Sequence, residues 1–359
     1  MEVKALLEKI SGVVSMTGYE YMAETDLRKI IGEDFKDVFD EVSFDKFGGC
    51  RLVKKGVRKI GGTKKIMLDA HLDQIGLVVT EILDDGFLRV KSLGGVDRNV
   101  VIASEFYVYT YEPENPFIFS KERRIPAVAV SVPPHLKKTP GNQLPQLQDI
   151  YLDTGYNSKE ELEKIVRVGS PVGFRPNFTS LENNLIADAG LDDRMCAAII
   201  MLAVKELKKM PDVDIHVVLS AGEEVTAVGA QTAAYEIDPD FAVVVDVGFA
   251  RGPDIDANAA FEIGKGSGID ISPAANIKLT RKVMALAKEK NIPFQSIVCP
   301  RSTGTNADDI AVTGSGIPCV VLSAPLKNMH MPTEIACIQD IENMVKLLSA
   351  IIENAERLA

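Results

Sequence analysis

Apolar runs and amphipathic stretches alternate along most of the chain. The runs 241–245 and 319–322 contain only apolar residues, which is typical of strands buried on both faces of a sheet. The run 195–207 is apolar almost all round at its start and predicts a buried helix. We also expect helices at residues 1–10, 22–31, 276–290 and 338–358, and strands at residues 38–47, 50–55, 65–71, 214–220 and 297–299. The alternation predicts an α/β fold with a mixed central sheet and flanking helices.

The pattern changes between residues 74 and 178. Short strand-like runs follow one another there, separated by turn residues such as Asp84-Asp85-Gly86 and Gly94-Gly95, and only one helix is expected, at residues 158–166. Closely spaced short strands indicate a small β barrel or sandwich, and a strand-rich segment within an α/β pattern indicates an inserted domain. We therefore expect a discontinuous α/β domain, residues 1–73 and 179–359, and an inserted β-rich domain, residues 74–178.

Histidines and carboxylates recur where the predicted strands end. Five segments each place such residues at a strand end or on the loop beyond it: His71 and Asp73, Asp192 and Asp193, Glu223 and Glu224, Asp246, and His330. Strand ends border the ligand crevice in open α/β sheets. Histidine and carboxylate ligands without thiolate suit zinc, cobalt or manganese in an open hydrolytic site. Taken alone, Glu223 and Glu224 would also fit the start of a helix, where the helix dipole stabilises carboxylates. Asp192 or Asp193 alone would also fit as a helix cap.

Together, these motifs resemble the M42 family of dinuclear metallo-aminopeptidases, which includes the glutamyl and the tetrahedral aminopeptidases. The matching motifs, in chain order, are His71-Leu72-Asp73, Leu191-Asp192-Asp193-Arg194, Glu223-Glu224-Val225 with Gly229, Asp246, and Met329-His330-x-Pro332. The resemblance extends from Ser15-Met16-Thr17-Gly18-Tyr19-Glu20 to the last predicted helix. It implies a zinc-peptidase-like catalytic domain and an inserted domain that mediates dimerisation.

The resemblance also implies a role for each site residue. Asp192 would bridge two divalent metal ions, with His71 and Asp246 completing the first site and Glu224 and His330 the second. Glu223 would act as the general base on a water between the metals, and Asp73 would orient the imidazole of His71. The implied activity is removal of N-terminal residues from short peptides, by a homodimer or a dodecamer.

Two segments depart from the family pattern. Gln74 stands where the family usually has glutamate after His-x-Asp, and Leu326-Lys327-Asn328 stands where Arg-Tyr usually precedes Met-His. The five expected ligands and the expected base are all retained. The departures therefore bear on substrate preference and metal affinity more than on catalysis.

Charge and composition narrow the possible partners. The formal net charge of -11 argues against nucleic acid, because binding to phosphates needs a basic surface. The N-terminus lacks the apolar segment of a signal peptide, and no run approaches the roughly 18 apolar residues that span a bilayer, so we expect a cytoplasmic protein without membrane contact. The cysteines are expected to be reduced and mostly buried: Cys50, Cys196, Cys299, Cys319 and Cys337.

Several other polar features have simpler interpretations. His135 is expected to be a structural loop histidine, and His216 a core histidine, because a single histidine is more often a hydrogen-bonding residue than a ligand. Gly264-Lys265-Gly266-Ser267-Gly268 lacks the spacing of a phosphate-binding loop and predicts a tight turn near the site. The polar segment 302–309 is expected to line the substrate cleft.

Three other functions share parts of this pattern. A metal-dependent deacylase or carboxypeptidase would use the same ligands. The products that it releases from peptides and from N-acyl amino acids would distinguish it from an aminopeptidase. A glycosidase needs two carboxylates about 5 to 9 Å apart across the bond, which adjacent strand residues facing opposite ways do not readily provide. A non-catalytic oligomeric metal-binding protein would have no need for an uncoordinated glutamate beside a complete ligand set.

Overall fold

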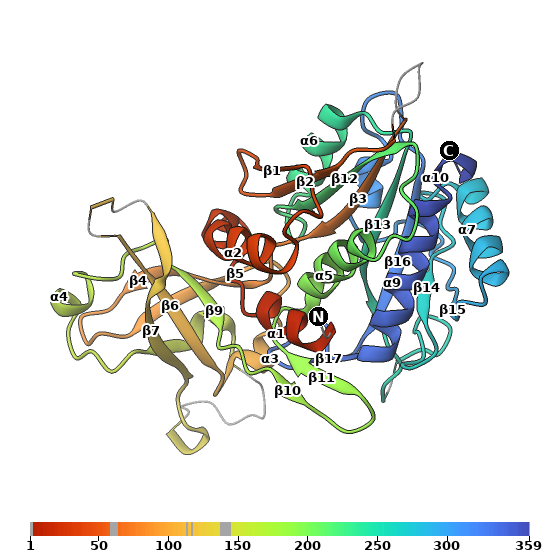
Figure 1. Cartoon of the computed structure of the whole chain (residues 1–359). Coiled ribbons are helices and arrows are strands. Elements are labelled where there is room, and N and C mark those ends of the chain that lie inside the picture. Colours follow the sequence, from red (N-terminus) through yellow and green to blue (C-terminus); the bar gives the residue numbers. More distant parts are fainter. Residues whose placement is uncertain are drawn as a thin grey trace.

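The computed structural model describes residues 3–57, 64–112, 114–115, 118–136, 145–253 and 255–358. An eight-stranded mixed sheet forms its centre (Figure 1). The strands lie in the order β1 (Glu41–Phe44), β2 (Cys50–Lys54), β12 (Val213–Ser220), β3 (Lys64–His71), β13 (Phe241–Phe249), β16 (Cys319–Leu326), β14 (Ser267–Ile269) and β15 (Phe294–Gln295). The four central strands, β12 to β16, run parallel, whereas β2 and β14 are antiparallel to their inner neighbours. The predicted mixed sheet is therefore confirmed.

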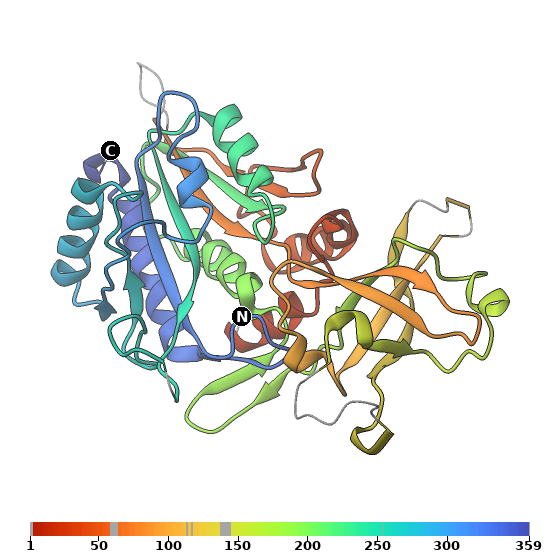
Figure 2. The ribbon, with the colours of Figure 1, turned by 180° about the vertical axis from the view of Figure 1, so that it is seen from behind.

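Helices cover both faces of this sheet. The larger hydrophobic core lies on one face, beneath α1 (Val3–Ser11), α2 (Glu24–Asp34), α5 (Leu191–Lys205), α7 (Ile277–Glu289), α9 (Ile338–Glu353) and α10 (Ala355–Leu358). Every residue of α5 from Leu191 to Val204 is buried, as its apolar sequence predicts. A smaller core lies on the other face, beneath α6 (Val228–Ile237) and α8 (Ala307–Ile310), which Figure 2 shows from behind.

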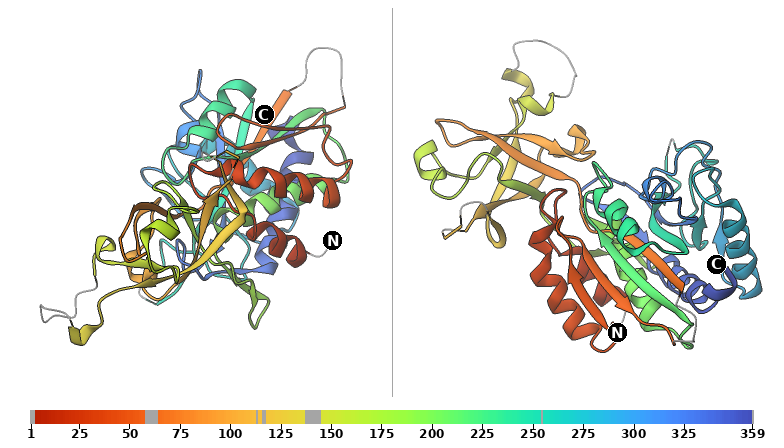
Figure 3. Two further views of the ribbon diagram at one scale, coloured as in Figure 1. Left: turned by 90° about the vertical axis from the view of Figure 1, so that its left-hand side faces the viewer. Right: turned by 90° about the horizontal axis from the view of Figure 1, so that it is seen from above.

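A closed six-stranded barrel stands to one side of the sheet and its helices (Figure 3). Its strands are β4 (Gly76–Ile82), β5 (Leu88–Leu93), β8 (Tyr151–Asp153), β7 (Phe119–Val130), β6 (Glu105–Tyr111) and β9 (Pro171–Phe174). The barrel has a hydrophobic core of its own. The expected barrel-like unit is confirmed, while its exact boundaries and its role in dimerisation remain predictions.

The remaining elements are short. A three-stranded sheet joins β10 (Thr179–Ser180), β11 (Leu185–Asp188) and β17 (Glu334–Cys337). The short helices are α3 (Arg98–Val101), α4 (Lys159–Leu162), η1 (Glu20–Ala23), η2 (Pro134–Leu136) and η3 (Leu147–Asp149). All five cysteines are free, and all except Cys299 are buried, as predicted. No helix in the described parts of the chain is long and apolar enough to span a membrane.

Three predicted elements differ from the structure. The helix expected at residues 158–166 is limited to the single turn of α4. The strand expected at residues 297–299 is only an isolated bridge between Ile271 and Val298, and the regular pairing lies earlier, in β15. The helix expected at residues 338–358 is divided into α9 and α10 at Asn354, which ends α9 in a non-helical conformation. The side chain of Asn354 donates to the backbone oxygen of Ala350, and this local bond competes with continuation of the helix.

Candidate active site

The predicted site residues meet at the carboxyl ends of the parallel strands. His71 is the last residue of β3 and pairs with Ser220, the last residue of β12. Asp246 lies near the end of the adjacent parallel strand β13, and Asp192 lies at the start of α5. The parallel strands therefore deliver side chains from distant segments to one edge of the sheet.

The carboxylate of Asp192 lies between two histidines. Its Oδ1 is 3.2 Å from Nε2 of His71, and its Oδ2 is 3.5 Å from Nε2 of His330. The same nitrogen of His330 is 3.5 Å from Oε2 of Glu224. The two oxygens of one carboxylate thus face two different histidines, as a bridging carboxylate would require.

Two groups of side chains, which share His71, could each hold a metal ion. Within each group, the ligand atoms lie within 4.8 Å of one another. The first consists of His71, Asp192 and Glu224, and the second of His71, Asp193 and Asp246. Asp193, which is also compatible with a capping role in the sequence, is fully buried and accepts a hydrogen bond from the backbone nitrogen of His71. These groups contain four of the five predicted ligands and the carboxylate of Asp193, which stands beside His71 and Asp246 where Asp192 was expected. The fifth, His330, lies outside both groups and is 3.5 Å from Asp192 and from Glu224.

Glu223 and Glu224 lie on a turn between β12 and α6. Gly222 has a φ of +75°, and the backbone bends there, so the two side chains occupy different parts of one site. Oε2 of Glu223 is 3.9 Å from Nε2 of His71, whereas Glu224 faces His330. Helix α6 begins only at Val228, with no acidic residue in its first turn. The two glutamates are therefore not the start of a helix.

Asp73 contacts both the histidine and the glutamates. Nδ1 of His71 is 2.8 Å from the backbone oxygen of Asp73 and 3.6 Å from its Oδ1. The carboxylate of Asp73 accepts hydrogen bonds from the backbone nitrogens of Glu223 (3.0 Å) and Glu224 (3.2 Å). One residue thus positions the imidazole of His71 and the turn that carries both glutamates.

The crowding of buried carboxylates favours cations. Burial, followed by the charge of Asp192, raises the pKa of Glu224 to about 9. Burial also raises the pKa of Asp246 well above its usual range, with the charges of Glu223 and Asp192 acting in the same direction. A divalent cation would oppose both effects, because it compensates the buried negative charge. The donor set is therefore suited to hard or borderline divalent metals.

Comparisons with known proteins agree with this geometry. The family model for M42 glutamyl aminopeptidase matches residues 48–347. The lysyl aminopeptidase of Pyrococcus furiosus is 35% identical over 97% of this chain and 96% of its own length. This chain belongs to the M42 peptidase family. It is therefore a metal-dependent aminopeptidase, a hydrolase that acts on peptide bonds.

Solved structures show the same fold along nearly the whole chain. An aminopeptidase from the archaeon Desulfurococcus kamchatkensis has a TM-score of 0.86 and 30% sequence identity, covering 98% of this chain and 94% of that one. The TET1 peptidase of Pyrococcus horikoshii has a TM-score of 0.82 and 26% identity, covering 98% and 99%. That peptidase is described as assembling into a tetrahedron or a large octahedral shell.

Glu334 is a residue of this M42 peptidase site that sequence reasoning missed. Its side chain is 2% exposed, and it accepts hydrogen bonds from the backbone nitrogens of Asp192 and His330, each at 3.1 Å. It therefore fixes the backbone of two predicted ligands from different segments. The only signal in the sequence is its position four residues after His330, which alone does not indicate this contact.

A buried polar network lies beneath the site of the peptidase. The side-chain nitrogen of Asn306 donates to Oδ2 of Asp69 and to Oγ of Ser220, each at 2.9 Å. Asp69 lies two residues before His71 on β3, and Ser220 pairs with His71 from β12. The network attaches the polar segment 302–309 to the sheet directly below the ligands.

The two departures from the family pattern lie beside the ligands. Gln74 is 8% exposed and lines a small cavity together with Asp192, Glu224 and Glu334. Lys327 exchanges backbone hydrogen bonds with Ile335 at 3.0 Å, immediately before the turn that carries His330. Gln74 therefore lies beside predicted ligands, and Lys327 lies three residues before His330; their effect on substrate preference and metal affinity remains a prediction.

Three other features lie outside the ligand groups. His135 is exposed in η2, whereas His216, which was expected in the core, is only half-buried in the middle of β12. The backbone nitrogens of Gly264 and Gly266 donate to the carboxylate of Asp340, at 2.6 and 2.7 Å. The glycine-rich turn therefore binds a side chain of the enzyme itself.

The barrel contacts the site through Gly95, and Gly95→Ala is expected to lower activity. A Cβ at this position would lie 2.7 Å from Nδ1 of His330, too close for any real contact. The imidazole has to shift, and if His330 is a metal ligand as predicted, disturbing its support is expected to cost about 10- to 100-fold in activity or metal affinity. Steady-state kinetics and metal analysis measure the effect.

Gly32→Ala is the matched control. Nothing lies within 4 Å of a Cβ there, and the residue is in the regular helix α2. Alanine is a better helix former than glycine, so this variant is expected to retain full activity. Full activity and metal content in Gly95→Ala would contradict a contact between the barrel and His330.

Proposed function

We propose that this enzyme removes N-terminal residues from short peptides by using two divalent ions of zinc, cobalt or manganese. Asp192 would hold both ions, with His71 and Asp246 on one side and Glu224 and His330 on the other. The observation that carries the proposal is the position of the Asp192 carboxylate, whose two oxygens face His71 and His330 at 3.2 and 3.5 Å.

The ions, when bound, would lower the pKa of a shared water and stabilise the oxyanion of the tetrahedral intermediate. Glu223 would accept a proton at its carboxylate and deliver it to the nitrogen of the leaving amine. Its position supports this role, because it lies beside His71 at 3.9 Å without belonging to either group of ligand atoms. Asp73 would keep Glu223 in place through the backbone nitrogen that it binds.

The test compares metal-free protein with protein reconstituted with zinc, cobalt or manganese. The substrates are aminoacyl anilides and short peptides with free or acetylated N-termini. We expect the reconstituted enzyme to release single residues from free N-termini and the metal-free enzyme to be inactive. Cleavage of acetylated substrates, or release from the C-terminus, would instead support a deacylase or a carboxypeptidase. Retention of full activity without metal would overturn the proposal.

We also propose that the enzyme assembles with itself, through the barrel into a homodimer and in the larger case into a dodecamer. The similar TET1 structures support this, since one is described as a dodecamer and another as a tetrahedron or octahedral shell. Light scattering measures the mass in solution. A mass equal to the 39.0 kDa of a single chain would contradict self-assembly.

A further inference from the structure

Glu20 is a buried carboxylate beside the turn of residues 222–227, the glutamate turn. It begins η1 and is 2% exposed. Its Oε1 accepts a hydrogen bond from the backbone nitrogen of Gly18 at 3.0 Å, and the backbone N–H of Gly222 also interacts with the carboxylate. Burial raises the pKa of Glu20 to about 7, and the charge of Asp73 acts in the same direction. Because Glu20 lies outside both groups of ligand atoms, metal binding does not account for this buried carboxylate.

Two carboxylates divide the first backbone nitrogens of the glutamate turn. Asp73 accepts hydrogen bonds from the nitrogens of Glu223 and Glu224, at 3.0 and 3.2 Å. Glu20 is the carboxylate beside the nitrogen of Gly222. Hydrogen bonds from a backbone N–H to a carboxylate are stronger than those between neutral groups. The two side chains therefore hold adjacent parts of the same backbone segment.

The internal hydrogen bonds of the glutamate turn converge on Gly222. Its backbone oxygen accepts hydrogen bonds from the backbone nitrogens of Thr226 and Ala227, each at 2.8 Å. Its φ of +75° produces the bend that separates the side chains of Glu223 and Glu224. A group that fixes the nitrogen of Gly222 therefore fixes the bend and the direction in which Glu223 points.

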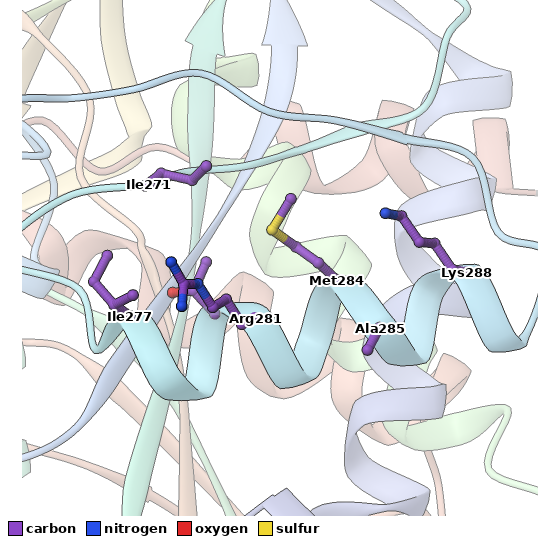
Figure 4. A pocket seen from close by; sticks show the side chains of 7 residues that line it. Ile271, Ile277, Arg281, Met284, Ala285 and Lys288 are labelled. Carbon is purple, nitrogen blue, oxygen red and sulfur yellow. The ribbon is translucent and has the colours of Figure 1, made fainter.

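Packing does not hold the glutamate turn on the side of Glu20. An open cavity of about 500 Å³ lies there, lined by Gly222, Val225 and Thr226 from the turn and by Glu20 from η1. Val225 is 62% exposed. Another cavity, of about 440 Å³, lies over α7 (Figure 4), and none of its lining residues belongs to the turn. The space beside Glu20 therefore gives the turn room to move when a hydrogen bond is lost.

Glu20 itself is held in place by two segments. A Cβ at Gly48, whose φ is +93°, would lie 3.1 Å from Cβ of Glu20, so the loop before β2 passes directly over this side chain. The backbone of Gln74 donates to the oxygen of Ser15 at 2.9 Å and accepts from the nitrogen of Thr17 at 3.1 Å. The segment that leads to Glu20 is thus joined to the loop that follows β3. A side chain fixed in this way is able to position another segment.

We propose that Glu20 is a positioning residue for Glu223 and acts by holding the backbone nitrogen of Gly222. The inference rests on the proposed function, in which Glu223 accepts the proton, and adds a residue that this function needs. Without a carboxylate at position 20, the N–H of Gly222 loses its acceptor and the glutamate turn relaxes into the cavity. Glu223 is then misplaced, and a displacement of about 1 Å costs about 10²-fold in rate. Asp73 still binds the backbone of Glu224, so the metal site stays loaded.

The experiment measures kcat, KM and metal content of the reconstituted enzyme on the aminoacyl anilide that it cleaves fastest. In Glu20→Ala, kcat is expected to fall about 10²-fold, while KM and metal content stay unchanged. Glu20→Gln keeps one acceptor oxygen at nearly the same place, so this variant is expected to recover part of the lost kcat.

Glu353→Gln is the matched control, because Glu353 is also a glutamate that binds backbone nitrogens. Its Oε1 accepts hydrogen bonds from the nitrogens of Lys208 and Lys209, at 2.7 and 3.2 Å. These two residues follow the far end of α5, about 20 Å along the helix from Asp192. The control is therefore expected to keep the kcat of the unmodified enzyme. Thermal unfolding of each variant reports whether the fold is intact.

Double variants separate positioning from a general structural role. Glu20→Ala and Glu20→Gln are each combined with Glu223→Gln, which removes the proposed base. If Glu20 acts through Glu223, the double variants have the same kcat as Glu223→Gln alone, because the group that would be misplaced is already inactive. A structural role unrelated to the base predicts the same fold-loss in both backgrounds.

The outcomes separate this inference from the proposed function. Equal losses in both backgrounds, loss of metal, or an unchanged kcat in the Glu20 variants would overturn the role of Glu20 and leave the proposed function intact. If Glu20→Ala does not fold, Glu20→Gln provides the same comparison. Full activity in Glu223→Gln would overturn the proposed base and this inference with it. Failure to hydrolyse any anilide or any peptide with a free N-terminus would overturn the proposed function itself.

Discussion

Glu223→Gln is expected to lower kcat by about 10²- to 10⁴-fold, which is the usual contribution of a positioned general acid or base. Glutamine has nearly the shape of glutamate but cannot accept the proton that the proposed mechanism assigns to this side chain. Glu223 lies outside both groups of ligand atoms, so the metal content is expected to stay unchanged. Steady-state kinetics and metal analysis of the same preparation test both statements.

Glu236→Gln serves as the matched control for this substitution. Its side chain is 72% exposed and pairs with Arg51 at the surface, so its loss is expected to leave kcat unchanged. Full activity in Glu223→Gln would contradict the role as a base. Loss of metal together with activity would mean that Glu223 is a ligand.

Asp192→Asn is expected to remove both metal binding and activity. The side chain is 5% exposed and faces both His71 and His330, so a change of one oxygen to an amide disturbs both proposed sites at once. Even residues that only support a ligand contribute about 10- to 100-fold to metal affinity, and a shared ligand is expected to contribute more. Elemental analysis gives the metal content per chain, and titration with zinc gives the affinity.

Asp238→Asn is the control for the chemical change at Asp192. Asp238 is exposed and has a φ of 49°, a conformation that asparagine tolerates as well as aspartate does. We expect this variant to bind metal as the unmodified enzyme does. If Asp192→Asn still holds two ions per chain with unchanged affinity, Asp192 does not bridge them.

Much of the fold follows from local patterns. The apolar run 241–245 became part of the buried strand β13, and the nearly all-apolar run after Asp193 became the buried helix α5. These predictions succeeded because a strand buried on both faces, or a helix buried on all sides, leaves an almost continuous apolar run in the sequence. The segment 297–299 was predicted wrongly because a short apolar run does not specify where its partner strand ends.

The ligand residues of the candidate site could be predicted from the sequence, but the residues that hold them in place could not. His71, Asp192, Glu224, Asp246 and His330 were found because they form ordered motifs at strand ends. Glu334, which binds the backbone of Asp192 and His330, and Asn306, which binds Asp69, were not assigned these contacts. Asp192 is 142 residues from Glu334, and Asp69 is 237 residues from Asn306, and no local pattern encodes such contacts.

The sequence by itself determined the family, the α/β class with its inserted barrel, and the identity of the residues at the strand ends. Only the tertiary structure decided how those residues are combined. The register of the parallel strands brings His71 beside Asp246, and the bend at Gly222 separates Glu223 from Glu224. The physical reason is that residue type and spacing reflect local backbone geometry, whereas the distances between ligands depend on strand order and packing across the whole sheet.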